Sequence, residues 1–144
     1  MQGAGKLKSH VTPRRILFGA FDRHNFGDLL FPHLMTALLP GLPCEFAGLA
    51  ERDLQAFGGH RVKSLATRED NLPADLIHVG GELLTCSAFQ AAVMLLDPAA
   101  AAAAIARYDH DPRAAADWAA RQLGTSRSMP YVAGREAIAA SGRL

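Results

Sequence analysis

The sequence has few of the features that mark several large classes of protein. Two cysteines occur among 144 residues, Cys44 and Cys86, and neither belongs to a C-x-x-C pair. A disulfide framework is therefore not expected, and both thiols should stay reduced. Fifteen Lys and Arg balance fourteen Asp and Glu, which leaves a formal charge of +1. This balance argues against a nucleic-acid-binding protein, which would carry a strongly basic surface.

Long apolar runs are also missing. The longest stretches without a formal charge, residues 29–44 and 83–96, are too short to span a bilayer. The first fifteen residues carry basic side chains but no apolar run, so they lack the middle region of a secretory signal. We therefore expect a cytoplasmic protein without a membrane span, and we interpret residues 1–13 as a flexible basic arm.

Three catalytic signatures are absent as well. The chain contains no G-x-S-x-G elbow, no G-x-x-x-x-G-K phosphate loop and no G-x-G-x-x-G fingerprint. Serine hydrolases, nucleoside triphosphatases and standard dehydrogenases thereby lose sequence support. The spacing of His24, His33, His60 and His78 matches no compact zinc pattern, and we predict no metal site.

What the chain does contain is an alternation of strand and helix patterns. Short apolar runs predict strands at 14–20, 44–49, 61–65, 75–79 and 129–132. Helical spacing follows residue 28, with Pro32 expected near the first turn, and continues over 51–57, 88–96, 99–108 and 113–123. This order predicts an α/β fold, a Rossmann-like three-layer domain with a mostly parallel sheet over residues 14–135. Residues 136–144 would be a tail or a severed linker to a second domain.

Two loops at predicted strand ends are candidates for a ligand site, because ligands of such sheets bind beyond the carboxyl ends of the strands. In the first, His24-Asn25-Phe26-Gly27-Asp28, the backbone amides could hold an anion and Asp28 could accept a sugar hydroxyl. Asn25 and Asp28 could equally be only a turn and a helix cap. The second loop contains Gly80, Gly81 and Glu82, and its alternative role is a tight turn with a solvated Glu82.

Together the two loops resemble motifs of the polysaccharide pyruvyl transferase family. The segment ILFGAFDRHNFGD, residues 16–28, resembles the family's first strand and its Asn-x-Gly-Asp loop. The segment DLIHVGGELL, residues 75–84, is similar to a later strand that ends in a glycine cluster. The resemblance extends loosely from about residue 14 to about residue 135.

The resemblance implies a transferase of exopolysaccharide biosynthesis with one half of a two-domain glycosyltransferase-B-like fold. Such enzymes transfer a pyruvyl group from phosphoenolpyruvate to a pair of sugar hydroxyls as a ketal, without a metal or dinucleotide cofactor. Phosphoenolpyruvate is then the donor substrate and a sugar or glycan the acceptor. The implied chemistry adds a sugar hydroxyl to the enol ether carbon and releases phosphate as the ketal closes, with Asp28 as the base.

The remaining motif residues are assigned to substrate binding by the same resemblance. Asn25 and Gly27 belong to the acceptor-side loop, with His24 as a neighbour, and Gly80 and Gly81 form the second loop. Glu82 replaces the third glycine that is more common in the family, and its carboxylate could bind sugar hydroxyls instead.

Two other functions stay open from the residues alone. The first is a non-catalytic sugar- or nucleotide-binding Rossmann-like module, which would show saturable binding without turnover. The second is a structural partner whose Ala-rich segments 99–108 and 113–123 form an interface, and a homo-oligomer stays open with it.

The first prediction concerns activity of the 144-residue chain by itself. The basic residues that hold the donor in the family are expected in a second half, and the only dense basic stretch here is the N-terminal arm. We therefore expect no acceptor-dependent release of phosphate from phosphoenolpyruvate by the isolated chain. Detectable pyruvyl transfer in that assay would refute this expectation.

Overall fold

The computed structural model describes residues 14–41, 43–67 and 74–132, so the expected arm at 1–13 and tail at 136–144 lie outside the described residues. In the described part, one sheet contains β1 (Arg14–Phe18), β2 (Cys44–Gly48), β3 (Arg52–Asp53), β4 (Arg61–Ser64) and β5 (Ala74–His78). The spatial order is β3-β4-β2-β1-β5. Strands β4, β2, β1 and β5 are parallel, and β3 pairs antiparallel with β4. The predicted α/β class with a mostly parallel sheet is confirmed.

The order of the strands determines where a ligand can bind. The chain proceeds from β1 to β2 and β4 on one side, and then returns to place β5 on the other side of β1. This reversal is the switch point of a Rossmann-like sheet, where the loops after two neighbouring strands diverge and leave a crevice. The crevice is therefore expected beyond the carboxyl ends of β1 and β5.

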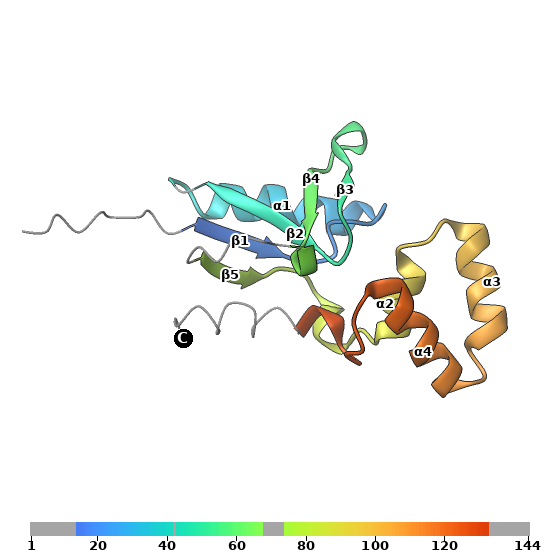
Figure 1. The fold of residues 1–144 in the computed structure, drawn as a ribbon. Coiled ribbons are helices and arrows are strands. Elements are labelled where there is room, and N and C mark those ends of the chain that lie inside the picture. The colour runs from blue at the N-terminus through green and yellow to red at the C-terminus, as the bar shows by residue number, and fades with distance from the viewer. Residues whose placement is uncertain (1–13, 42, 68–73, 133–144) are drawn as a thin grey trace, which may run out of the picture.

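The described helices are α1 (Phe26–Leu38), α2 (Ala88–Met94), α3 (Pro98–Tyr108) and α4 (Pro112–Leu123). In Figure 1, α1 lies along one face of the sheet, while α2, α3 and α4 gather beyond the strand ends. Ala91 of α2 and Leu123 of α4 pack with the sheet residues Ile16 and Phe18. None of the described helices is both long and apolar enough to cross a membrane.

The core divides between the two faces of the sheet because side chains alternate along a strand. Leu17 of β1 packs toward α1, together with Phe31 and Met35 of that helix. Its neighbours Ile16 and Phe18 belong to the cluster on the opposite face. All three β1 residues are almost fully buried, as expected for a strand covered on both sides.

Helix α1 begins earlier than its sequence pattern indicates. The side chain of Asn25 accepts a hydrogen bond from the backbone N–H of Gly27 at 3.0 Å and caps the helix before Phe26. Pro32 therefore lies in the helix interior, where it removes a backbone hydrogen bond, and the expected position near the first turn is wrong.

One row of apolar side chains on α1 faces away from the sheet. It consists of Phe26, Leu30, Leu34 and Leu38, which are all exposed and stand four residues apart.

Two other segments differ from the predicted elements. Residues 51–57 form strand β3 and a 3₁₀ turn, Gln55–Phe57, instead of one helical turn, because Leu54 bonds across the hairpin to His60. The strand predicted at 129–132 is a 3₁₀ turn, Pro130–Val132, in which Val132 N–H donates to the carbonyl of Met129. Pro130 has no N–H to donate to a sheet ladder, which favours the turn.

A buried carboxylate closes the turn after β1. Asp22 is fully buried, and its Oδ2 accepts a hydrogen bond from the backbone N–H of Ala50, just after β2, at 2.7 Å. Its Oδ1 makes no hydrogen bond with the described residues. A Cβ added at Gly48 would lie 2.6 Å from Oδ2, so only glycine fits there without a shift. Burial raises the pKa of Asp22 above 3.8, although the Ala50 hydrogen bond opposes this shift.

The second prediction follows from the raised pKa of Asp22. A raised folded-state pKa means that its contribution to stability is present below the unfolded value of 3.8 and is lost as pH rises through the folded pKa. We expect the free energy of unfolding of the wild type, minus that of Asp22→Asn, to fall as pH rises from about 4 to 8. Urea denaturation of both proteins across this range measures the difference.

Asp22→Ala is the companion variant for this experiment. It removes the acceptor of the Ala50 N–H, which should cost about 1–3 kcal/mol throughout the range. A difference between wild type and Asp22→Asn that does not change with pH would contradict the prediction.

Candidate functional site

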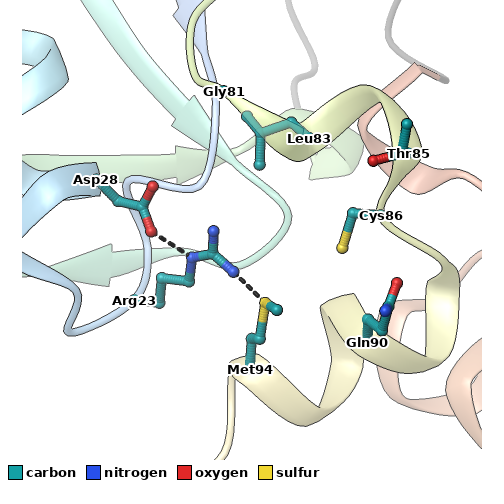
Figure 2. A pocket seen from close by; sticks show the side chains of 8 residues that line it. All are labelled: Arg23, Asp28, Gly81, Leu83, Thr85, Cys86, Gln90 and Met94. Atoms are coloured by element: carbon teal, nitrogen blue, oxygen red, sulfur yellow. Dashed lines mark hydrogen bonds and ion pairs between the residues drawn. The ribbon is translucent and has the colours of Figure 1, made fainter.

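A small pocket lies at the switch point, beyond the carboxyl ends of β1 and β5. Its cavity volume is about 160 Å³. The loop after β1 contributes Arg23 and Asp28 at the start of α1, and the loop after β5 contributes Gly81. The far side is formed by the 3₁₀ turn Glu82–Thr85 and by α2, with Leu83, Thr85, Cys86, Gln90 and Met94 as lining residues (Figure 2).

Arg23 is the central charged group of this pocket. Its Nε donates to Oδ2 of Asp28 at 2.7 Å, and both side chains are only 14% exposed. Its Nη1 donates to the sulfur of Met94, so the guanidinium bridges from the first loop to α2 (Figure 2). A cation and a carboxylate are thereby held at fixed positions in one cavity, where they can orient a polar ligand.

The wall opposite Arg23 is held by local contacts of the α2 start. The side chain of Gln90 accepts from the backbone N–H of Ser87, and the Ser87 hydroxyl accepts from the N–H of Gln90. This reciprocal capping box fixes the first turn of α2 against the pocket. Cys86 is buried beside it, and burial raises the pKa of its thiol. A thiol with a raised pKa is a poor nucleophile near neutral pH.

A larger groove adjoins the pocket. Its volume is about 950 Å³, and it shares Arg23 and Met94 with the pocket. His24 and Asn25 line one side, and Arg52 of β3 lines another, where its Nη2 donates to the carbonyl of Leu95 at 2.6 Å. The segment from Leu95 to Pro98, between α2 and α3, completes the wall.

The structure distributes the residues of the first motif between these two cavities. Asp28 lines the pocket, whereas His24 and Asn25 line the groove. The Asn25 amide oxygen is engaged by the N–H of Gly27 as a helix cap, which is the structural role that the sequence left open. The ring of His24 packs edge-on against Phe57 with centroids 4.6 Å apart.

The second motif contributes less to the pocket than the first. Gly81 lines the pocket. Gly80 adopts a φ of 144°, a backbone conformation that residues other than glycine rarely adopt. A Cβ at Gly80 would also meet the side chain of Leu83 at 2.6 Å. Glu82 begins the following 3₁₀ turn, and its side chain lies outside the described part of the structure.

Several lining residues were not predicted from the sequence. Arg23 stands directly beside the first motif, so its position in a strand-end loop was an available signal. Arg52, Gln90 and Met94 come from elements without a recognisable motif, and only the folded arrangement brings them to the two cavities.

The histidines of the described segments do not form a metal centre. The rings of His33 and His60 are tilted by 41° with centroids 4.4 Å apart, and Phe46 stacks on His60. No group of three His, Cys, Asp or Glu residues suitable for a metal occurs within residues 14–41, 43–67 and 74–132. Cys44 and Cys86 are not joined by a disulfide.

Comparison of the chain with protein-family models, with curated proteins and with solved structures gives no match. The two cavities and their residues are therefore the basis for assigning a function.

The third prediction tests the ion pair that organises the pocket. A double-mutant cycle with Arg23→Met and Asp28→Asn should give a coupling energy of about 1–3 kcal/mol, because the pair is short and largely buried. Urea denaturation of the wild type, both single variants and the double variant measures the coupling.

The Arg61–Asp53 pair provides a matched control. Its atoms lie 3.2 Å apart and its side chains are 71% and 46% exposed, so Arg61→Met and Asp53→Asn should couple much more weakly than the buried pair. Equal coupling energies for the two pairs would contradict the assigned importance of Arg23 and Asp28.

Proposed function

We propose that this domain binds the sugar acceptor of a polysaccharide pyruvyl transferase-like enzyme, as its N-terminal, glycosyltransferase-B-like half. The observation that carries the proposal is that Asp28 of the first motif and Gly81 of the second line one pocket at the switch point. The two sequence segments that resemble the family are separated along the chain, yet they meet at one cavity. A ligand that contacts both loops would explain why a polar side chain from one loop and the glycine backbone of the other line the same cavity.

The size of the pocket suits a single sugar ring. A cavity of about 150 Å³ is large enough to admit benzene, and the volume here is about 160 Å³. Arg23 supplies donors, Asp28 supplies acceptors and Gln90 supplies an amide, which together match the donor and acceptor pattern of sugar hydroxyls. Gly81 lets the ring approach the backbone closely.

In this proposal Asp28 is the residue that binds the reacting hydroxyl. Its Oδ2 is held by Arg23, which leaves Oδ1 to accept a hydrogen bond from a sugar hydroxyl in the pocket. As that hydroxyl oxygen bonds to the enol carbon that bears the phosphate of phosphoenolpyruvate, its proton passes to Asp28, and the methylene carbon takes a proton from water. The second hydroxyl then bonds to the same carbon as the bond from that carbon to phosphate breaks, and the proton of this hydroxyl leaves with the phosphate as the ketal closes.

A second function is supported by a specific observation on the same residues. The Asn25 amide is engaged as a helix cap and one Asp28 oxygen is engaged by Arg23. Both residues therefore have structural partners in the free protein, which favours a non-catalytic sugar- or nucleotide-binding module. Such a module would use the same pocket and differ only in the absence of transfer.

The fourth prediction separates these two functions through Asp28. In the full-length protein that carries this domain, Asp28→Asn should lower turnover by about a hundredfold or more, as loss of a positioned general base does. Acceptor-dependent phosphate release from phosphoenolpyruvate measures turnover, and titration with the acceptor monitored by amide chemical shifts measures binding. Asp117→Asn, at an exposed position of α4, is the matched control.

Each outcome of this experiment has a defined meaning. Loss of turnover in Asp28→Asn with retained binding supports the transferase. Binding that depends on Asp28 with no turnover in the wild type supports the binding module. Sugar binding that is equally unaffected by Asp28→Asn and Asp117→Asn would exclude the pocket as the acceptor site.

A further inference from the structure

We propose that the larger groove is a binding site for a phosphate ester, with Arg52 and Arg23 as its cationic groups and His24 beside them. This site is distinct from the small pocket proposed above to bind the sugar, called the sugar pocket below, although Arg23 borders both cavities. The proposal differs from the sequence-based expectation that all donor-binding basic residues belong to another half of the enzyme. Its basis is the arrangement of two arginines that are distant in sequence around one cavity.

The charges that line the groove favour an anion. Arg23, Arg52 and His24 can each donate hydrogen bonds, and Asp97 is the single carboxylate among the described lining residues. The Asp97 side chain accepts from the backbone N–H of Ala100 at 2.9 Å, so it is engaged in capping α3. The Arg23 charge is shared with Asp28 across the pocket, so Arg52 makes the larger contribution to the positive charge of the groove wall. Phosphate is, with carboxylate, an anion whose geometry matches the guanidinium group.

Each arginine retains donors beyond those used within the described residues. Arg23 uses Nε for Asp28 and Nη1 for Met94, and Nη2 is not engaged in this part of the chain. Arg52 uses Nη2 for the carbonyl of Leu95. These contacts fix both guanidinium groups before a ligand arrives, which reduces the entropy lost on binding.

The size of the groove is consistent with an extended ligand. Its volume of about 950 Å³ lies at the upper end of the range for small-molecule sites and far exceeds that of the sugar pocket. Because the two cavities share Arg23 and Met94, a phosphate in the groove can belong to a molecule that also reaches the pocket. Two sources have this chemistry, a phosphorylated sugar and phosphoenolpyruvate.

The fifth prediction uses isothermal titration of the 144-residue chain with three probes: glucose 1-phosphate, phosphoenolpyruvate and the uncharged methyl glucoside. Arg52→Gln should weaken binding of at least one phosphate ester by about tenfold or more and leave methyl glucoside binding unchanged, because one charge-assisted contact is lost. Arg61→Gln, on the neighbouring strand β4 and outside both cavities, is the matched control and should bind all three as the wild type does.

Arg52→Lys is the control for a folding defect in Arg52→Gln, because lysine keeps the positive charge but lacks the planar guanidinium group. We expect it to recover part of the affinity lost in Arg52→Gln. Wild-type affinity for both phosphate esters in Arg52→Gln, or an equal loss in Arg61→Gln, would overturn the proposal. Failure of both esters to bind the wild-type chain would overturn it as well.

The probes also distinguish this proposal from the proposed function. Tighter binding of glucose 1-phosphate than of phosphoenolpyruvate assigns the groove to a phosphorylated acceptor, and the reverse order assigns it to the donor. Ester binding that depends on Arg52, in a chain whose sugar binding does not depend on Asp28, would retain the phosphate site and reject the acceptor pocket. Sugar binding that depends on Asp28, in a chain that binds neither ester, would retain the acceptor pocket and reject the phosphate site.

Discussion

The buried carboxylate of Asp22 is the interaction on which both cavities depend. Its hydrogen bond to the N–H of Ala50 joins the chain leaving β1 to the chain leaving β2, and Gly48 must be small for the carboxylate to fit. Arg23 follows directly in sequence, so this anchored turn positions its backbone, and Asp28 and Met94 then hold its side chain. A buried carboxylate is costly unless it is hydrogen-bonded, and this bond offsets part of that cost.

Arg23 gives the site its organisation, because a single cation borders two cavities with different properties. On the pocket side it is paired with Asp28, so the local charge is balanced and neutral hydroxyls are suitable ligands. On the groove side it lies with Arg52 and His24, and the additional charge of Arg52 favours anions there. Neighbouring binding regions of opposite preference suit a ligand, or a pair of ligands, with one neutral and one anionic part.

The sequence predicted the parts of the fold that depend on local patterns. The apolar run at residues 16–18 in β1 and the run before Gly80 and Gly81 in β5 indicated parallel strands, and the helical spacing at 99–108 indicated α3. The expectation that β5 is a buried strand is wrong, because β5 lies at the end of the described sheet and its residues are half-buried or exposed. Errors arose where pairing between segments decides the conformation, as in the hairpin bond between Leu54 and His60. The pocket was predictable at the level of loops, from the rule for carboxyl ends of strands. Its contacts were not, because the Arg23–Met94 bridge joins residues far apart in sequence.

Helix α3 has little buried surface, and its first residue, Pro98, lines the groove. Among its residues only Ala104 is buried, and its Ala-rich sequence is stabilised mainly by intrinsic propensity, by the Asp97 cap and by Pro98 at the first turn. Helices with so little buried surface open locally at a fraction of the free energy of global unfolding, and their amide hydrogens exchange early. Asp97 and Pro98 also form the groove wall opposite the anchored turn. The part of the groove wall formed by Asp97 and Pro98 can therefore open locally for a longer ligand, while Met94 and Leu95 continue to hold Arg23 and Arg52.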